Sequence, residues 1–256
     1  MKNELFVTEL TRMYGDRVCV AGYVRNLGCV RPVFRRGDLT EAWLKIGPAA
    51  IIRPFAVVEL ELLENTPESP HTEDWVIDPT YRVVKRMVTQ DQRREILKTT
   101  DYGGVEYVFG APIHRGPGWY IEKGQGQRSL GTIVPAEISQ VRYGPNDYGD
   151  WDYRISFTDQ LRQSYRLTVT DLAFRYFLDH QLARGRLSTD EVARRILARL
   201  RQTEVFLRIG LARRWSRFPD RCFLQITGVY SFPDYLNGRC FADLALSPEE
   251  LAEHRR

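Results

Sequence analysis

The stretch DYRISFTDQLRQSYRLTVTD, residues 152–171, carries two alternating patterns in immediate succession. In DYRISFTD and again in SYRLTVTD, apolar and polar residues alternate, as they do in a strand with one buried and one solvated face. The intervening QLRQ, residues 160–163, joins the two patterns. The stretch therefore predicts two consecutive strands of a β-sheet, and the elements on either side decide which β-fold the chain adopts.

A helical region follows these two strands. Asp171 or the preceding Thr170 is placed to cap a helix through LAFRYFLDHQLA. Residues 188–191, Ser-Thr-Asp-Glu, have the form of a capping box, and the apolar residues after them fall on one stripe of a second helix. We therefore expect a helical insert over residues 171–202.

Strands are predicted on both sides of this insert. RSLGTIVPAEISQVRY forms a strand region before it, and EVFLRIGLAR and CFLQITGVY form two strands after it. Over residues 129–230 the order is thus three strands, a helical insert and two strands. This is the element order of an OB-fold, a five-stranded Greek-key barrel.

The N-terminal third also reads as strands. ELFVTEL, RVCVAGYV, CVRPVF and PFAVVELELL are rich in β-forming residues, and the last of them ends in alternating Val or Leu and Glu. A loop over residues 64–80, a short helix before Gly103 and a mostly irregular connection over residues 110–126 complete the first half. The expected fold class is mainly β with helical insertions (α+β).

Composition is that of a globular protein, with 43% hydrophobic and 27% charged residues. There is no apolar run long enough to span a membrane, and the N-terminus has no apolar stretch of the kind a signal peptide carries. We expect a cytoplasmic protein without a membrane partner. The spacing of the cysteines matches no zinc pattern, so we expect buried thiols, no metal and no cofactor; they are Cys19, Cys29, Cys222 and Cys240.

Positive charge is concentrated in one part of the chain. Residues 154–221 contain 15 arginines and 7 acidic residues, a balance of +8, whereas the whole chain has a net charge of +4. Such a block can attract a polyanion. A solvated helix surface with internal ion pairs would give the same count, and arginine outnumbers lysine 32 to 5 throughout the chain.

Four phrases together resemble the dual OB-containing domain family of prokaryotic proteins. They are RVCVAGYVRNLGCVRPV, PHTEDW, GQGQRSLGTIVP and YRLTVTDLAFRYFLD, and the resemblance extends from about residue 5 to 240. It implies two OB-like barrels and a role in nucleic-acid binding, and it brings no catalytic residues with it. We expect a first barrel within residues 1–110, including the PHTEDW loop and a short helix. A second barrel with the helical insert and a C-terminal loop and tail is expected within residues 111–256.

PHTEDW, residues 70–75, brings His71, Glu73, Asp74 and Trp75 together. A metal site needs three or four converging ligands, and only His114 is a plausible further one. Adjacent carboxylates on a strand point to opposite faces. We therefore favour a structural turn anchored by the tryptophan, with ligand contact or metal chemistry as alternatives.

GLARRWSRFPDR, residues 210–221, is the best candidate for nucleic-acid contact, because it interleaves arginines with aromatics between two predicted strands. Alternatively, the aromatics pack inward and the arginines are solvated. KGQGQRSLG lacks the pattern of a phosphate-binding loop, although an arginine in it could touch a phosphate. The candidate nucleic-acid-binding residues are Arg128, Arg166, Arg208, Arg213, Arg214, Trp215, Arg217 and Phe218.

The predicted function is non-enzymatic binding of nucleic acid, with single strands favoured, through a basic OB face that bears aromatics. The first alternative is a metal-dependent nuclease or other nucleic-acid-processing enzyme in which His71, Glu73 and Asp74 hold a divalent ion. The second is an interaction subunit of a prokaryotic multi-protein system, whose arginine-rich helices bind an acidic protein partner.

Overall fold

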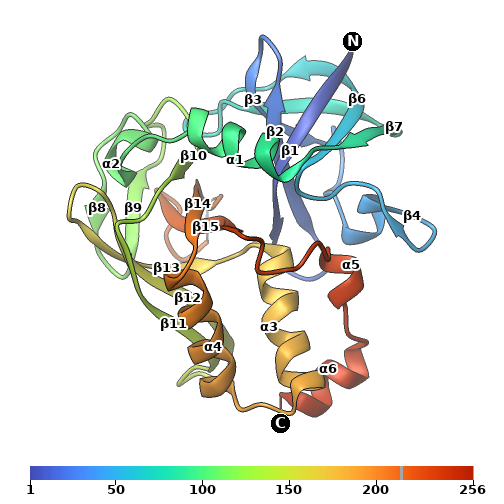
Figure 1. Cartoon of the computed structure of the whole chain (residues 1–256). Helices are drawn as coiled ribbons and strands as arrows, with labels where there is room; N and C mark the ends of the chain where they lie inside the picture. Colours follow the sequence, from blue (N-terminus) through green and yellow to red (C-terminus); the bar gives the residue numbers. More distant parts are fainter. Residues whose placement is uncertain (214–215, 256) are drawn as a thin grey trace.

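The N-terminal strands close into a five-stranded barrel in the computed structural model, which describes residues 1–213 and 216–255 (Figure 1). The strand order is β1-β2-β3-β7-β6, and β3 and β7 run parallel while the other neighbours are antiparallel. The strands are β1 (Lys2–Arg12), β2 (Val18–Val24), β3 (Gly28–Val33), β6 (Ala56–Asn65) and β7 (Asp74–Met87). The alternation predicted near residue 60 is confirmed, because Val58, Leu60 and Leu62 are buried between more exposed glutamates.

The second unit repeats this plan with an open edge. Its strands are β11 (Glu137–Pro145), β12 (Trp151–Thr158), β13 (Ser164–Val169), β14 (Glu204–Leu211) and β15 (Arg221–Phe232). β13 and β15 are parallel, as β3 and β7 are in the first barrel. A further strand, β10 (Leu130–Ile133), pairs with β14, so the sheet runs β10-β14-β15-β13-β12-β11 as a half-barrel. The expectation of OB-like barrels is confirmed, with one barrel closed and one open.

The helical insert lies between β13 and β14, as expected. It consists of α3 (Leu172–Gly185) and α4 (Thr189–Arg201). The Asp171 carboxylate caps α3 by accepting hydrogen bonds from the backbone N–H groups of Ala173 and Phe174. The Ser188 hydroxyl caps α4 at 3.2 Å from the backbone nitrogen of Glu191. The reciprocal half of the predicted capping box is absent, because the Glu191 carboxylate pairs with arginines on the next turn instead.

Short elements fill the connections. The predicted helix before Gly103 is α1 (Gln90–Thr99). The loop expected over residues 64–80 was wrong from residue 74 onward, where β7 begins, because this segment pairs with β6 and β3. The connection expected to be mostly irregular over residues 110–126 also contains a short hairpin, whose second strand pairs with β15. The remaining elements are η1 (Glu41–Leu44), β4 (Lys45–Ile46), β5 (Ala49–Ala50), α2 (Val105–Val108), β8 (His114–Arg115), β9 (Trp119–Glu122), α5 (Phe241–Leu244) and α6 (Pro248–His254).

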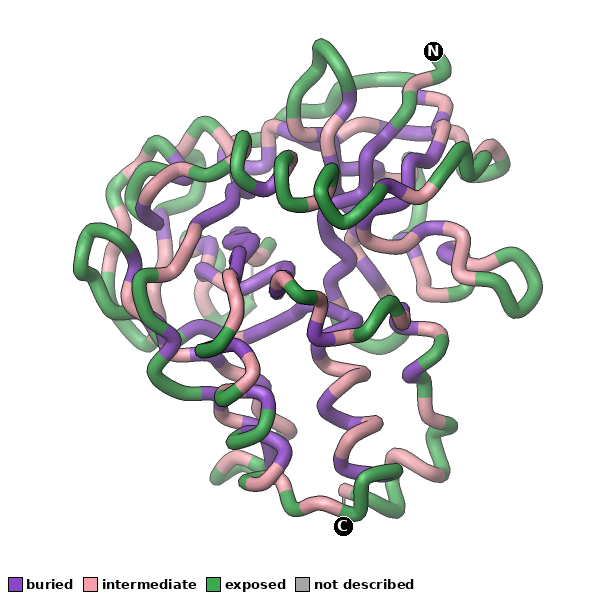
Figure 2. The backbone as a smooth tube through the Cα atoms, viewed as in Figure 1, coloured by how far each residue is buried: buried purple, intermediate pink, exposed green. Residues whose placement is uncertain are grey.

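The two units are packed into one body rather than strung on a linker. Leu172 and Ala173 at the start of α3, and Phe241 of α5, belong to the apolar cluster inside the first barrel. A separate cluster joins Phe6 of β1 to Phe206 of β14. Figure 2 shows buried backbone running through the region where the two units meet. No helix in the described part of the chain has the length and apolar composition that a membrane crossing requires.

Candidate functional site

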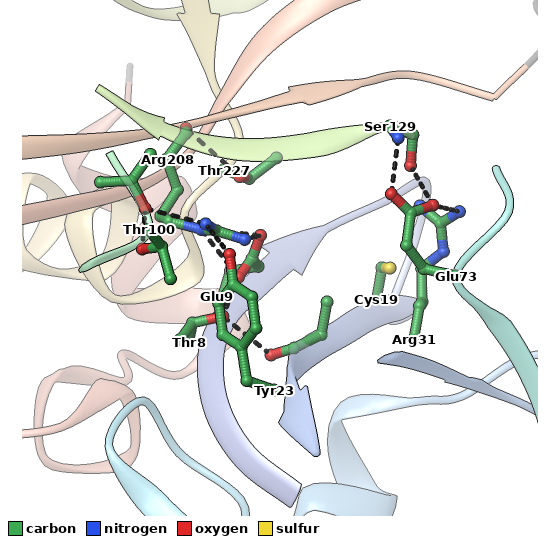
Figure 3. Close-up of polar contacts among 12 residues, drawn as sticks. Thr8, Glu9, Cys19, Tyr23, Arg31, Glu73, Thr100, Ser129, Arg208 and Thr227 are labelled. Atoms are coloured by element: carbon green, nitrogen blue, oxygen red, sulfur yellow. Dashed lines mark hydrogen bonds and ion pairs between the residues drawn. The ribbon is translucent and has the colours of Figure 1, made fainter. Parts of the chain in front are cut away.

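A buried arginine on β14 joins the two barrels (Figure 3). The Arg208 side chain has no exposed surface, and its Nη2 donates to the Glu9 carboxylate of β1 at 3.0 Å. Its Nη1 donates to the hydroxyls of Tyr23 and Thr132, each at 2.9 Å. Burial raises the pKa of Tyr23 to about 12, so the phenol stays protonated at neutral pH. The structure therefore corrects the expectation that Arg208 faces a ligand at the surface.

The PHTEDW loop connects β6 to β7 and lies against the second unit. The Glu73 carboxylate accepts hydrogen bonds from the Ser129 backbone N–H at 2.6 Å and from the Ser129 hydroxyl at 3.0 Å. The Thr72 hydroxyl donates to the Gln127 carbonyl at 2.8 Å. Trp75 is half-buried against the core of the first barrel. The loop thus fastens the first barrel to the segment that leads into β10.

The buried Asp74 carboxylate is paired both within the first barrel and across the same junction. The Asp74 carboxylate accepts from Arg31 Nε at 2.6 Å and from Arg213 Nη2 at 2.6 Å. His71 Nε2 lies 3.3 Å from the Leu211 carbonyl oxygen and must carry the hydrogen, because a carbonyl only accepts. Burial, and then the positive charges of Arg31 and Arg213, lower the pKa of His71 to about 3. The imidazole is therefore neutral at physiological pH.

These contacts engage the two carboxylates that a metal site in the loop would use. Arg31 and Arg213 hold the Asp74 carboxylate, and Ser129 holds that of Glu73. No cluster of three or more histidine, cysteine, aspartate or glutamate residues suited to a metal ion occurs in the described ranges. The contacts support the structural interpretation of PHTEDW, whose test is the stability measurement proposed below.

The same contacts occupy the ligand face of the first barrel. OB-folds bind ligands on the face of strands 2 and 3 and in the loops between strands 1 and 2 and strands 4 and 5. In the first barrel these parts correspond to β2, β3 and loops that include residues 66–73. Tyr23 of β2 contacts Arg208 of the second unit, and the loop contacts Ser129 and Leu211. Part of the face is thus taken up by the junction between the barrels, and a groove of about 340 Å³ beside Cys19 and Arg31 remains on it.

The corresponding face of the second unit is solvated and basic. On β12 the side chains of Tyr153, Ile155 and Phe157 point into the core, so the alternate residues point outward. Arg154 of β12 lies directly opposite Arg142 of β11 in the strand pairing.

Together with Arg166 of β13 and Arg115 of β8, these two arginines line a groove of about 620 Å³. We call this feature, lined by Arg115, Arg142, Arg154, Arg166 and the adjoining residues, the basic groove.

Aromatic side chains stand at the edge of the basic groove. Tyr148, in the loop between β11 and β12, is 91% exposed. The Asn146 side chain holds this loop by accepting from the backbone N–H groups of Tyr148 and Asp150. Trp119 of β9 is half-buried, and the Arg115 guanidinium lies 5.5 Å from its ring centroid. One ring is therefore open to solvent and one is fixed.

The charge of the groove is only partly balanced. Four arginines and two aspartates line it, a formal balance of +2. Asp152 lies 3.1 Å from Arg154 Nε and 3.5 Å from Arg142 Nε. Burial acts to raise the pKa of Asp152, but the hydrogen bond from Arg154 and the charges of both arginines lower it below its usual value. The carboxylate therefore stays ionised and orients the two guanidinium groups.

A second basic and aromatic surface adjoins the groove. The Arg221 guanidinium lies 4.5 Å from the Tyr120 ring centroid and 5.0 Å from that of Phe218. The Phe218 ring in turn packs edge-on against Phe223 at 5.7 Å. Gly116, which lines the groove, lies beside the Arg221 guanidinium. The segment after residue 216 thus continues the basic groove along the β8–β9 hairpin.

The described candidate residues from the sequence divide among four places. Arg166 lines the basic groove, and Arg217 lies 5.7 Å from the ring centroid of Phe218 on the adjoining surface. Arg213 binds Asp74 at the barrel junction, as described above. Arg128 is half-buried and donates to the Val108 carbonyl at 3.0 Å. The remaining two candidates, Arg214 and Trp215, lie outside the described residues.

Sequence reasoning missed several groove residues, namely Arg115, Trp119, Arg142, Tyr148 and Arg154. A signal for one of them was present, because the alternation in residues 152–171 places Arg154 on the polar face of its strand, as it does Arg166. The residues of the β8–β9 hairpin carried no such signal, since strands of two and four residues are too short to show a period.

Two consecutive five-stranded units, each with its third and fifth strands parallel, define a tandem OB-fold protein. The model of the dual OB-containing domain family matches residues 10–229. The chain belongs to this family, and the resemblance noted from the sequence is confirmed. No curated protein matches the sequence.

Proposed function

We propose that the protein binds nucleic acid, without catalysis, in the basic groove of its second OB unit. The observation that carries this proposal is the gathering of Arg115, Arg142, Arg154 and Arg166 on the outward face of β11–β13 and the adjacent hairpin. This is the face on which OB-folds bind oligonucleotides. Part of the equivalent face of the first barrel is engaged at the junction, whereas the face of the second unit carries the larger groove and more of the arginines.

The chemistry of the groove suits a single strand. Guanidinium groups bind phosphate oxygens in paired hydrogen bonds, and a row of them can follow a backbone. The exposed Tyr148 ring offers a stacking surface, worth roughly 1–3 kcal/mol per base where stacking occurs. Bases of a duplex are already stacked on one another, so only unpaired bases gain this contact. Single strands are therefore the favoured ligand.

The proposal is tested with fluorescently labelled 20-nucleotide single strands of DNA and RNA, titrated with protein at low salt. Wild type should bind at least one of them. Replacing Arg142, Arg154 and Arg166 together by Gln should weaken binding at least about tenfold, because three phosphate contacts are lost.

The control variant removes the same charge elsewhere. It replaces Arg25, Arg86 and Arg194, which are exposed and do not line the groove. This variant should bind within about twofold of wild type if local contacts rather than net charge decide affinity. Equal loss in both variants would contradict the assignment of the site.

The same titrations separate the alternatives. Shortening of the labelled strand in the presence of Mg²⁺ or Mn²⁺ would favour the nuclease alternative. Failure of wild type to bind any strand at low salt would leave an acidic protein partner as the better explanation of the groove.

A further inference from the structure

A smaller cavity, of about 220 Å³, lies between the barrels and shares no residue with the basic groove. Its walls come from both units and from the segment that follows β15. The lining residues are Arg53, Pro54, Phe55, Met87, Arg93, Asp171, Ala173, Tyr230, Asp234, Tyr235, Leu236, Gly238, Arg239 and Cys240.

Two arginines at this cavity make no hydrogen bond or ion pair with a carboxylate in the described part of the chain, although the charge of Asp234 acts on Arg93 and that of Arg53 on Asp243. Among residues 1–213 and 216–255, neither Arg53 nor Arg93 makes a side-chain hydrogen bond or ion pair, and Arg93 Nε is buried without a partner. The Arg93 guanidinium lies 4.8 Å from the Phe55 ring centroid. Burial lowers the pKa of Arg93, and the nearby positive charge of Arg53 acts in the same direction, against the opposing effect of Asp234. Two like charges are thus held close together.

The carboxylates that line the cavity are already committed to the backbone. Asp234 accepts from the backbone N–H groups of Leu236 at 2.9 Å and Gly238 at 3.0 Å. Asp171 accepts from three backbone N–H groups, at the start of α3 and at Val229 of β15. These hydrogen bonds stabilise the loop and the helix, and neither carboxylate is within ion-pair distance of Arg53 or Arg93.

A buried phenol adds a third polar group. Tyr235 is 1% exposed, and its ring packs edge-on against Phe174 and Phe177 of α3. Its hydroxyl has no hydrogen-bond partner within the described part of the chain. Tyr235 lines the cavity, and burial, followed by the negative charges of Asp171 and Asp234, raises the pKa of its phenol. A buried hydroxyl of this kind is destabilising unless it finds an acceptor.

The remaining walls are apolar. Apolar side-chain surface is contributed by Phe55, Met87, Tyr230 and Leu236. Phe55 adopts a φ of 70°, a left-handed conformation that is strained for a bulky residue and that occurs preferentially at functional sites. A cavity of about 150 Å³ accommodates benzene. The space here therefore admits a single ring together with one anionic group.

We propose that this cavity binds a small organic anion, in which a phosphate or carboxylate group sits between Arg53, Arg93 and the Tyr235 hydroxyl and a single ring contacts the apolar wall. The two guanidinium groups and the phenol supply donors to the anion, which supplies the acceptors that they lack. The site is independent of the proposed nucleic-acid interface.

The proposal is tested by calorimetric titration in a chloride-poor amine buffer. The probes are phenyl phosphate and benzoate, with inorganic phosphate and the neutral molecule phenol as comparisons. At least one of the two ring-bearing anions should bind, and it should bind more tightly than both inorganic phosphate and phenol.

Variants assign the site. Arg53→Gln with Arg93→Gln should weaken binding of that anion at least about tenfold, since two charge-assisted hydrogen bonds are lost. Tyr235→Phe removes only the hydroxyl and should weaken binding a few-fold while the protein remains folded. Arg86→Gln, at an exposed position outside the cavity, should leave binding unchanged.

Three results would overturn the proposal. They are failure of both ring-bearing anions to bind at millimolar concentration, unchanged affinity in the double arginine variant, and equal affinity for phenol. The variant lacking the three groove arginines should bind the anion like wild type, which keeps this test separate from that of nucleic-acid binding.

Discussion

At the scale of single residues, buried charge determines how the two barrels meet. Arg208 and Glu9 are both buried, and each is the other's counter-ion. Glu9 also accepts from the Thr8 hydroxyl. Removing one member of a buried pair leaves an uncompensated charge, which is more costly than removing both.

The first prediction follows from this asymmetry. Glu9→Leu should destabilise the protein by about 3–5 kcal/mol, because the Arg208 guanidinium remains buried without its partner. Adding Arg208→Met should recover much of that loss. Urea denaturation of the two variants and wild type checks the prediction, and a double variant no more stable than Glu9→Leu would contradict it.

The second prediction concerns pH. The pKa of His71 is about 3 in the folded protein and ordinarily about 6.5, so between these values the unfolded chain binds a proton that the folded protein excludes. Stability due to this residue is thus present above pH 6.5 and is lost as pH falls toward 3.

His71→Gln keeps a donor for the Leu211 carbonyl and does not titrate. Between pH 6 and 4 wild type should lose up to about 1.4 kcal/mol per pH unit more than this variant. Parallel pH profiles of the two proteins would show that the histidine does not carry the effect.

Arg208 also shows why some residues resist prediction from sequence. Every residue of β14 after Glu204 is buried. The strand therefore has no alternation of apolar and polar residues that would show which way the Arg208 side chain points. Its partner Glu9 lies 199 positions away. Only the packing of the two units, which no local pattern encodes, brings these two charges together.

At the scale of elements, local signals were sufficient for the helical insert. The start of α4 at Ser188 was predicted from the residue type, and its hydroxyl accepts from the backbone N–H of Glu191. The predicted hydrogen bond from the Ser188 backbone N–H to the Glu191 carboxylate does not form, because arginines on the following turn pair with that carboxylate.

The third prediction tests this cap. Ser188→Ala should destabilise the protein by about 1 kcal/mol, because one backbone N–H of the first turn loses its acceptor. Ser188→Asp, which retains an acceptor at the cap, should stay close to wild type. The denaturation midpoints of the two variants and wild type test the prediction. An unchanged midpoint for the alanine variant would mean that the cap does not contribute to stability.

The β8–β9 hairpin marks the limit of prediction at this scale. Its strands have two and four residues, and glycines and a proline separate them. These residues form a strand pair because β9 pairs with the edge of β15. This is a tertiary contact, and no periodic pattern in residues 110–126 indicates it. The hairpin matters for the candidate site because Arg115 and Trp119 form one wall of the groove.

At the scale of the whole molecule, two OB-like units could be predicted, but the order of elements could be predicted only in part, because β7 of the first barrel begins within residues 64–80, which were predicted to be a loop. The sequence could not show which unit offers its ligand face, because that depends on how the units pack. The PHTEDW loop, interpreted as a structural turn, turns out to lie in the junction that engages the first barrel.

The fourth prediction concerns this junction. Glu73→Ala should lower the melting temperature, since the buried Ser129 N–H and hydroxyl lose their acceptor. Binding of oligonucleotide per folded molecule should stay near the wild-type value, because the loop does not line the basic groove. A fully stable variant that has lost binding would reverse the assignment and make PHTEDW part of the ligand site.

The most direct test of the central claim is the salt dependence of binding to a single strand. Each phosphate contact contributes about 0.7 to the slope of log affinity against log salt concentration. Replacing Arg142, Arg154 and Arg166 by Gln should therefore lower the magnitude of the slope by about 2 relative to wild type. The control variant with Arg25, Arg86 and Arg194 replaced should keep the wild-type slope. If the groove variant also keeps that slope, phosphates do not contact the groove and the account is contradicted.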